Sequence, residues 1–196
     1  MEKQSEDDTA QDRSIQKNKS SVEFLYSGFN AIAPFQPGDF ILIHRKMWFS
    51  RLIQFGQRIY YPKKYARWNH CVLIVSKDGN IIEALTKGVT PGHISKYRNY
   101  EYYLVRVNAT DDDAQEILDY ANYALTVHQK YSISIFLSLF FGFLLGSRFR
   151  FGRLGTTICS GLVATALTRT GAIFEFPPEY CTPADLAEYY EVDPKH

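Results

Sequence analysis

The stretch HCVLIVSKDGNIIEAL occupies residues 70–85 and decides the fold. Its first part, residues 71–75, is rich in β-branched side chains and predicts a strand. Asp78-Gly79 is a dipeptide that favours a two-residue hairpin turn, and residues 81–85 predict the returning strand. We therefore expect an antiparallel hairpin at the centre of the molecule.

The two strands of this hairpin carry polar side chains among apolar ones. A two-residue turn would pair Ile74 with Glu83, and the alternation of side chains along a strand would then put His70 and Glu83 on one face. In a flat sheet the two would lie too far apart along the strands for a direct bond. Strong twist or a bulge would have to close the gap.

Other segments show the patterns of an α+β protein with an antiparallel sheet packed against helices. The turn Pro37-Gly38-Asp39 introduces a strand at residues 40–43, and residues 102–107 predict a further strand. Helices are predicted at three places by apolar spacing or a helix-start signal, and at a fourth by Thr182-Pro183. These segments are residues 47–59, 114–125, about 157–168, and a short helix from residue 182.

Composition limits the classes of function. The chain has 196 residues, of which 45% are hydrophobic, and its net charge is +1, so it has the composition of a globular domain and no global charge for nucleic-acid binding. Residues 1–21 are polar and predict a disordered tail before a single domain at 22–196. They contain no apolar signal segment, and we expect a cytoplasmic protein.

Residues 155–163 predict a loop that leads into a helix, with Thr156 or Thr157 as its cap. Cys159 would lie in the first turn, where the helix dipole and unpaired backbone N–H groups lower a thiol's pKa and can hold an oxyanion. Ser160 and Gly161 are small and leave room for a substrate. Cys159 is therefore the candidate nucleophile, although a buried cysteine is more often only a small apolar residue.

His70 is the candidate base and Glu83 its orienting partner, since a carboxylate in an apolar strand needs a partner to be buried. Cys71 follows His70 on a strand and faces the other way, and Cys181 lies in a loop, so we interpret both as core residues. No spacing of ligands predicts a metal site or a cofactor. The other histidines remain as structural or solvated alternatives; they are His44, His93, His128 and His196.

Several short motifs, taken in order, resemble a known superfamily. Cys159-Ser160-Gly161-Leu162-Val163 resembles the nucleophile motif of NlpC-type cell-wall peptidases, but here it follows His70 by 89 positions, whereas in most members it precedes the His strand. That order resembles the circularly permuted YiiX/YaeF-like papain-fold hydrolases, which are related to lecithin-retinol acyltransferase-like enzymes. Further matching motifs are Pro37-Gly38-Asp39, Ile82-Glu83-Ala84, Gly88-Val89 and Thr182-Pro183-Ala184-Asp185-Leu186.

The resemblance covers about residues 36–190 and implies a permuted papain-like fold with a small barrel-like sheet. Carried over residue by residue, it implies Cys159 as nucleophile, His70 as base and Glu83 as third polar residue. One departure bears on the substrate: these peptidases commonly have Asp directly before the Cys, where it reads a substrate amine. Here that residue is Ile158, which argues against cleavage of a peptide with a free amino group.

An uncharged apolar run extends from Ser132 to Gly146, and three arginines follow it: Arg148, Arg150 and Arg153. The run is shorter than the roughly 20 residues that a membrane-spanning helix needs. It predicts either a buried core segment or a peripheral contact with a membrane or acyl chain, with the arginines on anionic headgroups.

Three functions compete on these observations. The first is a thiol hydrolase that forms an acyl-enzyme on Cys159 and cleaves an amide or peptide bond of a small substrate. The second is a lipid acyl hydrolase or acyltransferase with the same three residues. The third is a non-catalytic binding module. Ile158 and the apolar run favour the lipid substrate, while the resemblance favours amide hydrolysis, which we rank first.

Overall fold

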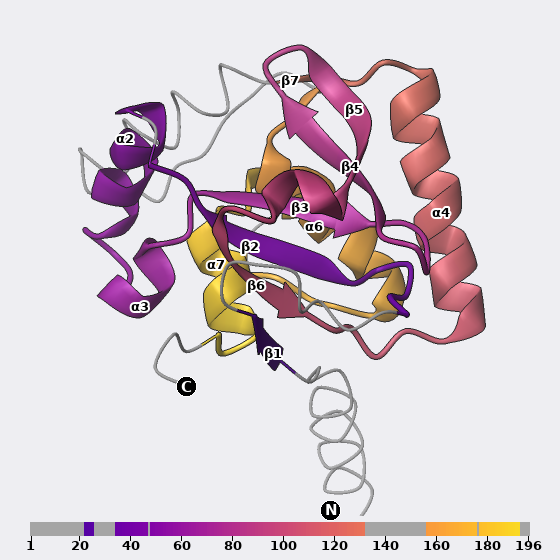
Figure 1. The fold of residues 1–196 in the computed structure, drawn as a ribbon, viewed down its shortest axis with the longest axis horizontal. Coiled ribbons are helices and arrows are strands. Elements are labelled where there is room, and N and C mark those ends of the chain that lie inside the picture. Colours follow the sequence, from indigo (N-terminus) through magenta and orange to yellow (C-terminus); the bar gives the residue numbers. More distant parts are fainter. Residues whose placement is uncertain (1–21, 26–33, 47, 132–155, 176, 193–196) are drawn as a thin grey trace, which may run out of the picture.

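The structure is a computed structural model that describes residues 22–25, 34–46, 48–131, 156–175 and 177–192. At the centre of the described part is an antiparallel sheet of six strands in the order β1-β6-β2-β3-β4-β5 (Figure 1). The strands are β1 (Val22–Leu25), β2 (Phe40–His44), β3 (His70–Ile74), β4 (Asn80–Leu85), β5 (Gly88–His93) and β6 (Glu101–Val105). The expected α+β class with an antiparallel sheet is confirmed.

Helices lie around this sheet. In Figure 1, α6 and α7 are behind β2 and β3, α4 stands at one end of the sheet, and α2 and α3 gather at the other. The helices are α2 (Trp48–Gln57), α3 (Lys63–Ala66), α4 (Asp111–Thr126), α6 (Cys159–Leu167) and α7 (Pro183–Tyr189). Single 3-10 turns are η1 (Ile94–Tyr97), η2 (Thr168–Thr170) and η3 (Pro178–Tyr180). A short parallel pair joins β7 (Lys130–Tyr131) to β8 (Thr156–Thr157).

The two faces of the sheet belong to two separate apolar clusters, because side chains alternate along each strand. One face packs Leu42, Cys71 and Leu73 against residues of α4, α6 and α7. The opposite face packs Val72 and Ile74 with residues of η1. The central strands are buried on both sides, which explains why residues 40–43 form an unbroken apolar run.

Local signals in the sequence set the starts of two helices. Thr110 caps α4 by accepting a hydrogen bond from the Asp113 backbone, and the Asp113 side chain accepts one from the Thr110 backbone. Thr182 and Asp185 form the same reciprocal pair at α7, with Pro183 in its first turn. The predicted helices at 114–125 and from residue 182 are therefore confirmed, with α4 beginning at Asp111.

The predicted register of the β3–β4 hairpin is wrong by two residues. Ile74 pairs with Ile81, not with Glu83. The turn is longer than expected because Val75 bonds to Asn80 and Gly79 N–H donates to Ser76 O, so the connection spans residues 76–79. Gly79 has a φ of +87°, a conformation that glycine adopts without strain. A shift of two keeps every side chain on its predicted face, and it moves Glu83 toward His70.

One further prediction needs correction, and one strand of the sheet was not predicted. Thr156 and Thr157 do not cap the helix that contains Cys159; they form β8, and the cap position is Ile158, which offers no side-chain hydrogen bond. Strand β5 was not predicted, because Gly88, Pro91 and Gly92 are poor strand formers. Pro91 is tolerated there since β5 is the last strand of the sheet and needs hydrogen bonds on one side only.

Two predicted features lie outside the described residues: the tail at 1–21, and the run Ser132–Gly146 with Arg148, Arg150 and Arg153. Among the helices that the structure does describe, none combines the length and the apolar character needed to cross a bilayer.

Candidate active site

His70 is the first residue of β3 and is buried, with 5% of its surface exposed. The preceding residue fixes the strand end, because the Asn69 amide donates to Arg45 O and accepts from Arg45 N, both at 2.9 Å. His70 itself pairs with Ile43 of the neighbouring strand β2. The imidazole is thus held on a rigid strand rather than on a loop.

Glu83 lies behind the His70 ring, as the sequence predicted. Its Oε2 is 3.2 Å from His70 Nε2, and the residue is 1% exposed. Continuing the observed register places Glu83 across from Val72, two residues from His70, so ordinary side-chain reach closes the gap. The bulge or exceptional twist that a pairing of Glu83 with Ile74 would have required is unnecessary.

Tyr97, in η1, completes this group and is not among the residues predicted from the sequence. Its hydroxyl donates to Glu83 Oε2 at 2.5 Å, lies 3.2 Å from His70 Nε2, and accepts from Arg45 Nη2 at 2.8 Å. Arg45 and Lys96 also lie over the Tyr97 ring, and Lys96 Nζ donates to Glu83 Oε1 at 2.5 Å. The only sequence signal for this role is an aromatic residue one short turn after a strand, which is too common to be specific.

This network fixes the tautomer of His70. Burial raises the pKa of Tyr97, so its hydroxyl keeps its proton and gives it to Glu83. Glu83 is ionised, because hydrogen bonds from His70, Lys96 and Tyr97 outweigh the effect of burial and lower its pKa to about 2. Both neighbours of His70 Nε2 are therefore acceptors toward it, and Nε2 carries the proton. Nδ1 is left for another partner.

Cys159 supplies that partner. It is the first residue of α6, is 7% exposed, and lies close enough to His70 and Cys71 for both to lower its pKa. His70 and Cys71 face opposite sides of the sheet, and Cys159 belongs to the same apolar cluster as Cys71. Cys159 nevertheless lies close enough to His70 for each of the two groups to shift the pKa of the other.

The electrostatics favour a thiolate–imidazolium pair. The hydrogen bond from Cys71, followed by the charge and hydrogen bond of His70, lowers the pKa of Cys159 well below its usual range despite burial. Burial alone would lower the pKa of His70, but the charge and hydrogen bond of Cys159 and the hydrogen bond to Glu83 raise it overall. Each group thus stabilises the charged form of the other.

The start of α6 leaves hydrogen-bond donors free for a substrate oxygen. The helix has no side-chain cap, and its first internal backbone bond runs from Leu162 N to Ile158 O at 2.9 Å. Thr157 Oγ1 instead donates to Ile158 O. The N–H groups at the beginning of a helix are those that have no partner within it, and here they adjoin the sulfur. Donors in this position can stabilise an oxyanion of the kind that forms when a thiolate attacks a carbonyl carbon.

The remaining cysteines are buried, and the remaining described histidines are hydrogen-bonded to nearby groups or exposed. Cys71 and Cys181 are fully buried, and burial with the Cys159 hydrogen bond raises the pKa of Cys71 well above its usual value. His44 Nδ1 lies 3.0 Å from Arg67 O, and His93 accepts from Ser95 N at the start of η1. His128 is exposed, and His196 is outside the described residues. Within those residues no group of three or more metal-binding side chains occurs.

We expect Cys159 to be alkylated by iodoacetamide at a pH where an ordinary thiol is still protonated. The contact with His70 supplies part of this effect, so His70→Ala should move the pH midpoint of alkylation upward by at least one unit. The measurement is the alkylation rate from pH 4 to 10, with the labelled residue identified by mass spectrometry. Labelling of Cys71 or Cys181 ahead of Cys159 in the native protein would contradict the assignment.

Tyr97→Phe should also move that midpoint upward, but by less than His70→Ala. In this variant the His70 imidazole keeps Glu83 at Nε2 and loses only the Tyr97 hydroxyl. The variant removes a single oxygen and retains the buried ring. Tyr123→Phe, at a residue that is 62% exposed, is the matched control and should leave the midpoint unchanged. An identical profile for Tyr97→Phe and wild type would show that the hydroxyl has no influence on the pair.

The low pKa of Glu83 predicts acid sensitivity of the fold. The carboxylate of the folded state has a pKa of about 2 against an ordinary value of 4.5, so its contribution is complete above pH 4.5 and is lost as the pH falls toward 2. The loss should reach about 3 kcal/mol of unfolding free energy. Urea titrations at pH 5 and pH 2.5 measure it, and Glu83→Gln should show a correspondingly smaller difference.

Two comparisons with known proteins found no relative of this chain. No protein-family model matches the chain, and no curated protein matches it. The site is therefore defined by its geometry.

Proposed function

We propose that the chain is a cysteine hydrolase that forms an acyl-enzyme on Cys159, with His70 as base and Glu83 as the residue that orients His70. The observation that carries this proposal is the group around His70: its Nε2 is held by Glu83 and Tyr97, while Cys159 lies near the same imidazole and raises its pKa. A histidine with one nitrogen anchored by a carboxylate and the other at a nucleophile is the arrangement that acyl-transfer enzymes need.

The reaction follows from this geometry. The Cys159 thiolate attacks the carbonyl carbon of an amide, and the resulting oxyanion is held by the N–H groups at the start of α6. The C–N bond breaks as His70 Nδ1 gives its proton to the leaving amine. Water then attacks the thioester while His70 takes up a proton, and the acid and the free thiolate–imidazolium pair are released. Glu83 remains ionised throughout.

The arrangement of elements supports the resemblance to permuted papain-like hydrolases. A helix that begins with the nucleophile packs against the antiparallel sheet strand that begins with the base, and the helix follows the strand along the chain. We propose on this basis that the fold is a permuted papain-like one of the YiiX/YaeF-like branch.

An acyl lipid is the second candidate substrate, with cleavage or transfer by the same three residues. The position before Cys159 is Ile158, which is 5% exposed, and therefore no carboxylate stands there to bind a substrate amine. This residue favours a substrate without a free amino group, and a fatty acyl ester or amide satisfies that condition.

Trapping the acyl group distinguishes these functions. The protein is incubated with a mixture of short peptides and, separately, with a phospholipid mixture, and is then quenched in acid and measured by intact mass spectrometry. A mass gain that maps to Cys159 and is released by hydroxylamine identifies the acyl donor. If neither mixture acylates the protein and Cys159 shows no enhanced alkylation, the chain is a non-catalytic binding module and the proposal fails.

A further inference from the structure

The connection between β2 and β3 concentrates positive charge. Residues 45–67 contain no Asp or Glu, although the net charge of the whole chain is only +1. The basic residues of this segment are Arg45, Lys46, Arg51, Arg58, Lys63, Lys64 and Arg67. Acidic residues are absent from the whole stretch between Asp39 and Asp78, and the acidic partners that the structure gives to this segment come from elsewhere in the chain: Glu83 for Arg45 and Glu101 for Arg67.

One side of α2 is fixed to the body of the protein by two glutamines. Gln57 is fully buried; its side chain donates to Trp68 O at 2.7 Å and accepts from Ala184 N at 3.1 Å. Gln54 is 8% exposed and donates to Arg67 O at 2.5 Å. These bonds determine which side of α2 faces inward, and therefore which side faces solvent.

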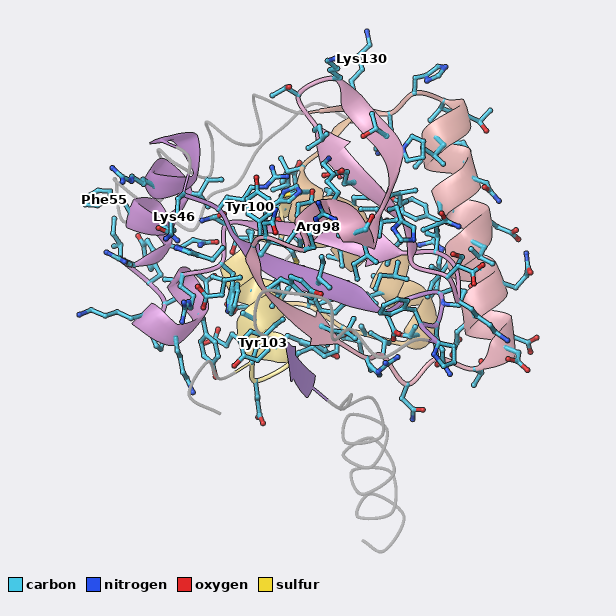
Figure 2. The ribbon with its side chains drawn as sticks, in the orientation of Figure 1. Lys46, Phe55, Arg98, Tyr100, Tyr103 and Lys130 are labelled. Atoms are coloured by element: carbon cyan, nitrogen blue, oxygen red, sulfur yellow. The ribbon has the colours of Figure 1, made fainter. Side chains whose placement is uncertain are left out.

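The outward side combines apolar and cationic side chains. Phe55 is 58% exposed, Ile59 is 48% exposed, and Arg51 and Arg58 are exposed as well. Successive members of this set are four, three and one residues apart, which places them on one side of a helix. Arg58 and Ile59 follow the last residue of α2, but their backbone N–H groups bond to Gln54 O and Gly56 O, so the helical turn continues through them. Figure 2 shows Phe55 pointing away from the sheet, at the outer edge of α2, with Lys46 on the same side of the molecule. We call Arg51, Phe55, Arg58 and Ile59 the α2 face.

We propose that the α2 face docks on an anionic lipid bilayer. A helical face with apolar side chains between arginines matches the interface of such a membrane, where the apolar groups enter the acyl region and the cations meet headgroup phosphates. Lys46 and Lys63, which belong to the same basic segment, are exposed as well and add to the attraction. A nucleic acid would use the cations equally well, but it offers the aliphatic Ile59 nothing to enter.

The docked face would lie close to the candidate active site. Arg45 opens the basic segment, and its guanidinium contacts Tyr97, while its backbone is tied to Asn69 beside His70. Gln54 of α2 bonds to Arg67 O, three residues before His70, so the bilayer would meet the protein near the end of the sheet where β3 begins. The docking inference concerns a surface alone, and it does not depend on whether Cys159 reacts.

Co-sedimentation with vesicles tests the inference on the full chain. The vesicles are phosphatidylcholine with phosphatidylserine, and phosphatidylcholine alone. We expect wild type to bind the anionic vesicles, and both Phe55→Ser/Ile59→Ser and Arg51→Glu/Arg58→Glu to bind at least about tenfold more weakly. High salt should reduce wild-type binding but leave part of the contribution of Phe55 and Ile59.

Matched controls change similar residues elsewhere on the described surface. Tyr123→Ser/Ile173→Ser removes two exposed apolar side chains, at 62% and 77% exposure, and Lys87→Glu/Lys130→Glu reverses two exposed charges. Both should bind as wild type does. Cys159→Ala should also bind normally, which separates this inference from the catalytic proposal. Thermal unfolding confirms that each variant is folded.

Two results would overturn the inference. In the first, both α2-face variants bind vesicles as tightly as wild type, while Phe140→Ser/Phe141→Ser/Leu144→Ser abolishes binding, so that the membrane contact lies in the 132–146 run alone. In the second, wild type binds neither kind of vesicle; binding of a DNA duplex that Arg51→Glu/Arg58→Glu weakens and Phe55→Ser/Ile59→Ser does not would then assign the face to nucleic acid.

Discussion

Replacing Cys159 by alanine should abolish turnover, with a loss of at least about a thousandfold, and leave the fold intact. The acyl-enzyme cannot form without the sulfur, and the remaining groups only polarise a bound carbonyl. The side chain is small, and its loss should cost about 1 kcal/mol of stability or less. The measurement is hydrolysis of whichever acyl donor labels the wild type, together with urea unfolding of both proteins.

Cys71→Ala is the matched control for this experiment, since it removes a neighbouring buried thiol that is not the proposed nucleophile. It should retain most of the activity, with a shift in the pH at which Cys159 ionises, because Cys71 hydrogen-bonds to Cys159. Activity that survives in Cys159→Ala and disappears in Cys71→Ala or Cys181→Ala would show that another sulfur is the nucleophile.

Gly161→Ala should destabilise the protein by about 3 kcal/mol, the upper end of the usual cost of overpacking. A Cβ at this position would lie 2.5 Å from the carbonyl oxygen of Glu179 and 3.0 Å from its carbonyl carbon. Those atoms belong to the backbone of η3, which packs directly on α6, so neither side can move away without separating the two elements. Chemical denaturation measures the loss.

Gly92→Ala provides the comparison for Gly161→Ala. A Cβ at Gly92 would lie 3.4 Å from the Ile81 side chain, which is ordinary contact, and should change stability by less than about 1 kcal/mol. Equal stabilities for the two alanine variants would mean that η3 can shift away from α6, and that the close approach is not a constraint on the fold.

The sequence predicts the sheet and helices well where the signals are local. The apolar run at 40–43, the Asp residues after Thr110 and the pair Thr182-Pro183 each act within a few positions, and each is observed. The hairpin register was missed because the turn between Val75 and Asn80 spans residues 76–79, and a local Asp-Gly pair does not report that length. Strand β5 was missed because its residues have low strand propensity and depend on β4.

The residues of the candidate site also differ in whether local sequence signals identify them. Cys159, His70 and Glu83 are predicted from local signals, namely a helix start, the first strand of a hairpin and a carboxylate within an apolar strand, and the structure brings them together. Tyr97 and Arg45 could not be found, because their roles arise only where η1 and the end of β2 meet in three dimensions. The burial of Glu83 made a partner necessary, but the sequence pointed to His70 alone, whereas Lys96 and Tyr97 also bind the carboxylate.

The long separation of Cys159 and His70 along the chain has a consequence for how the protein folds. Cys159 begins a helix and His70 begins a strand of the sheet, and 89 positions of chain separate the two residues. Closing so long a loop is entropically unfavourable until the sheet exists to receive α6. The lowered pKa of Cys159 should therefore appear late during refolding, after the secondary structure of the sheet has formed. The rate at which Cys159 gains its reactivity would then report the docking of α6 on the sheet.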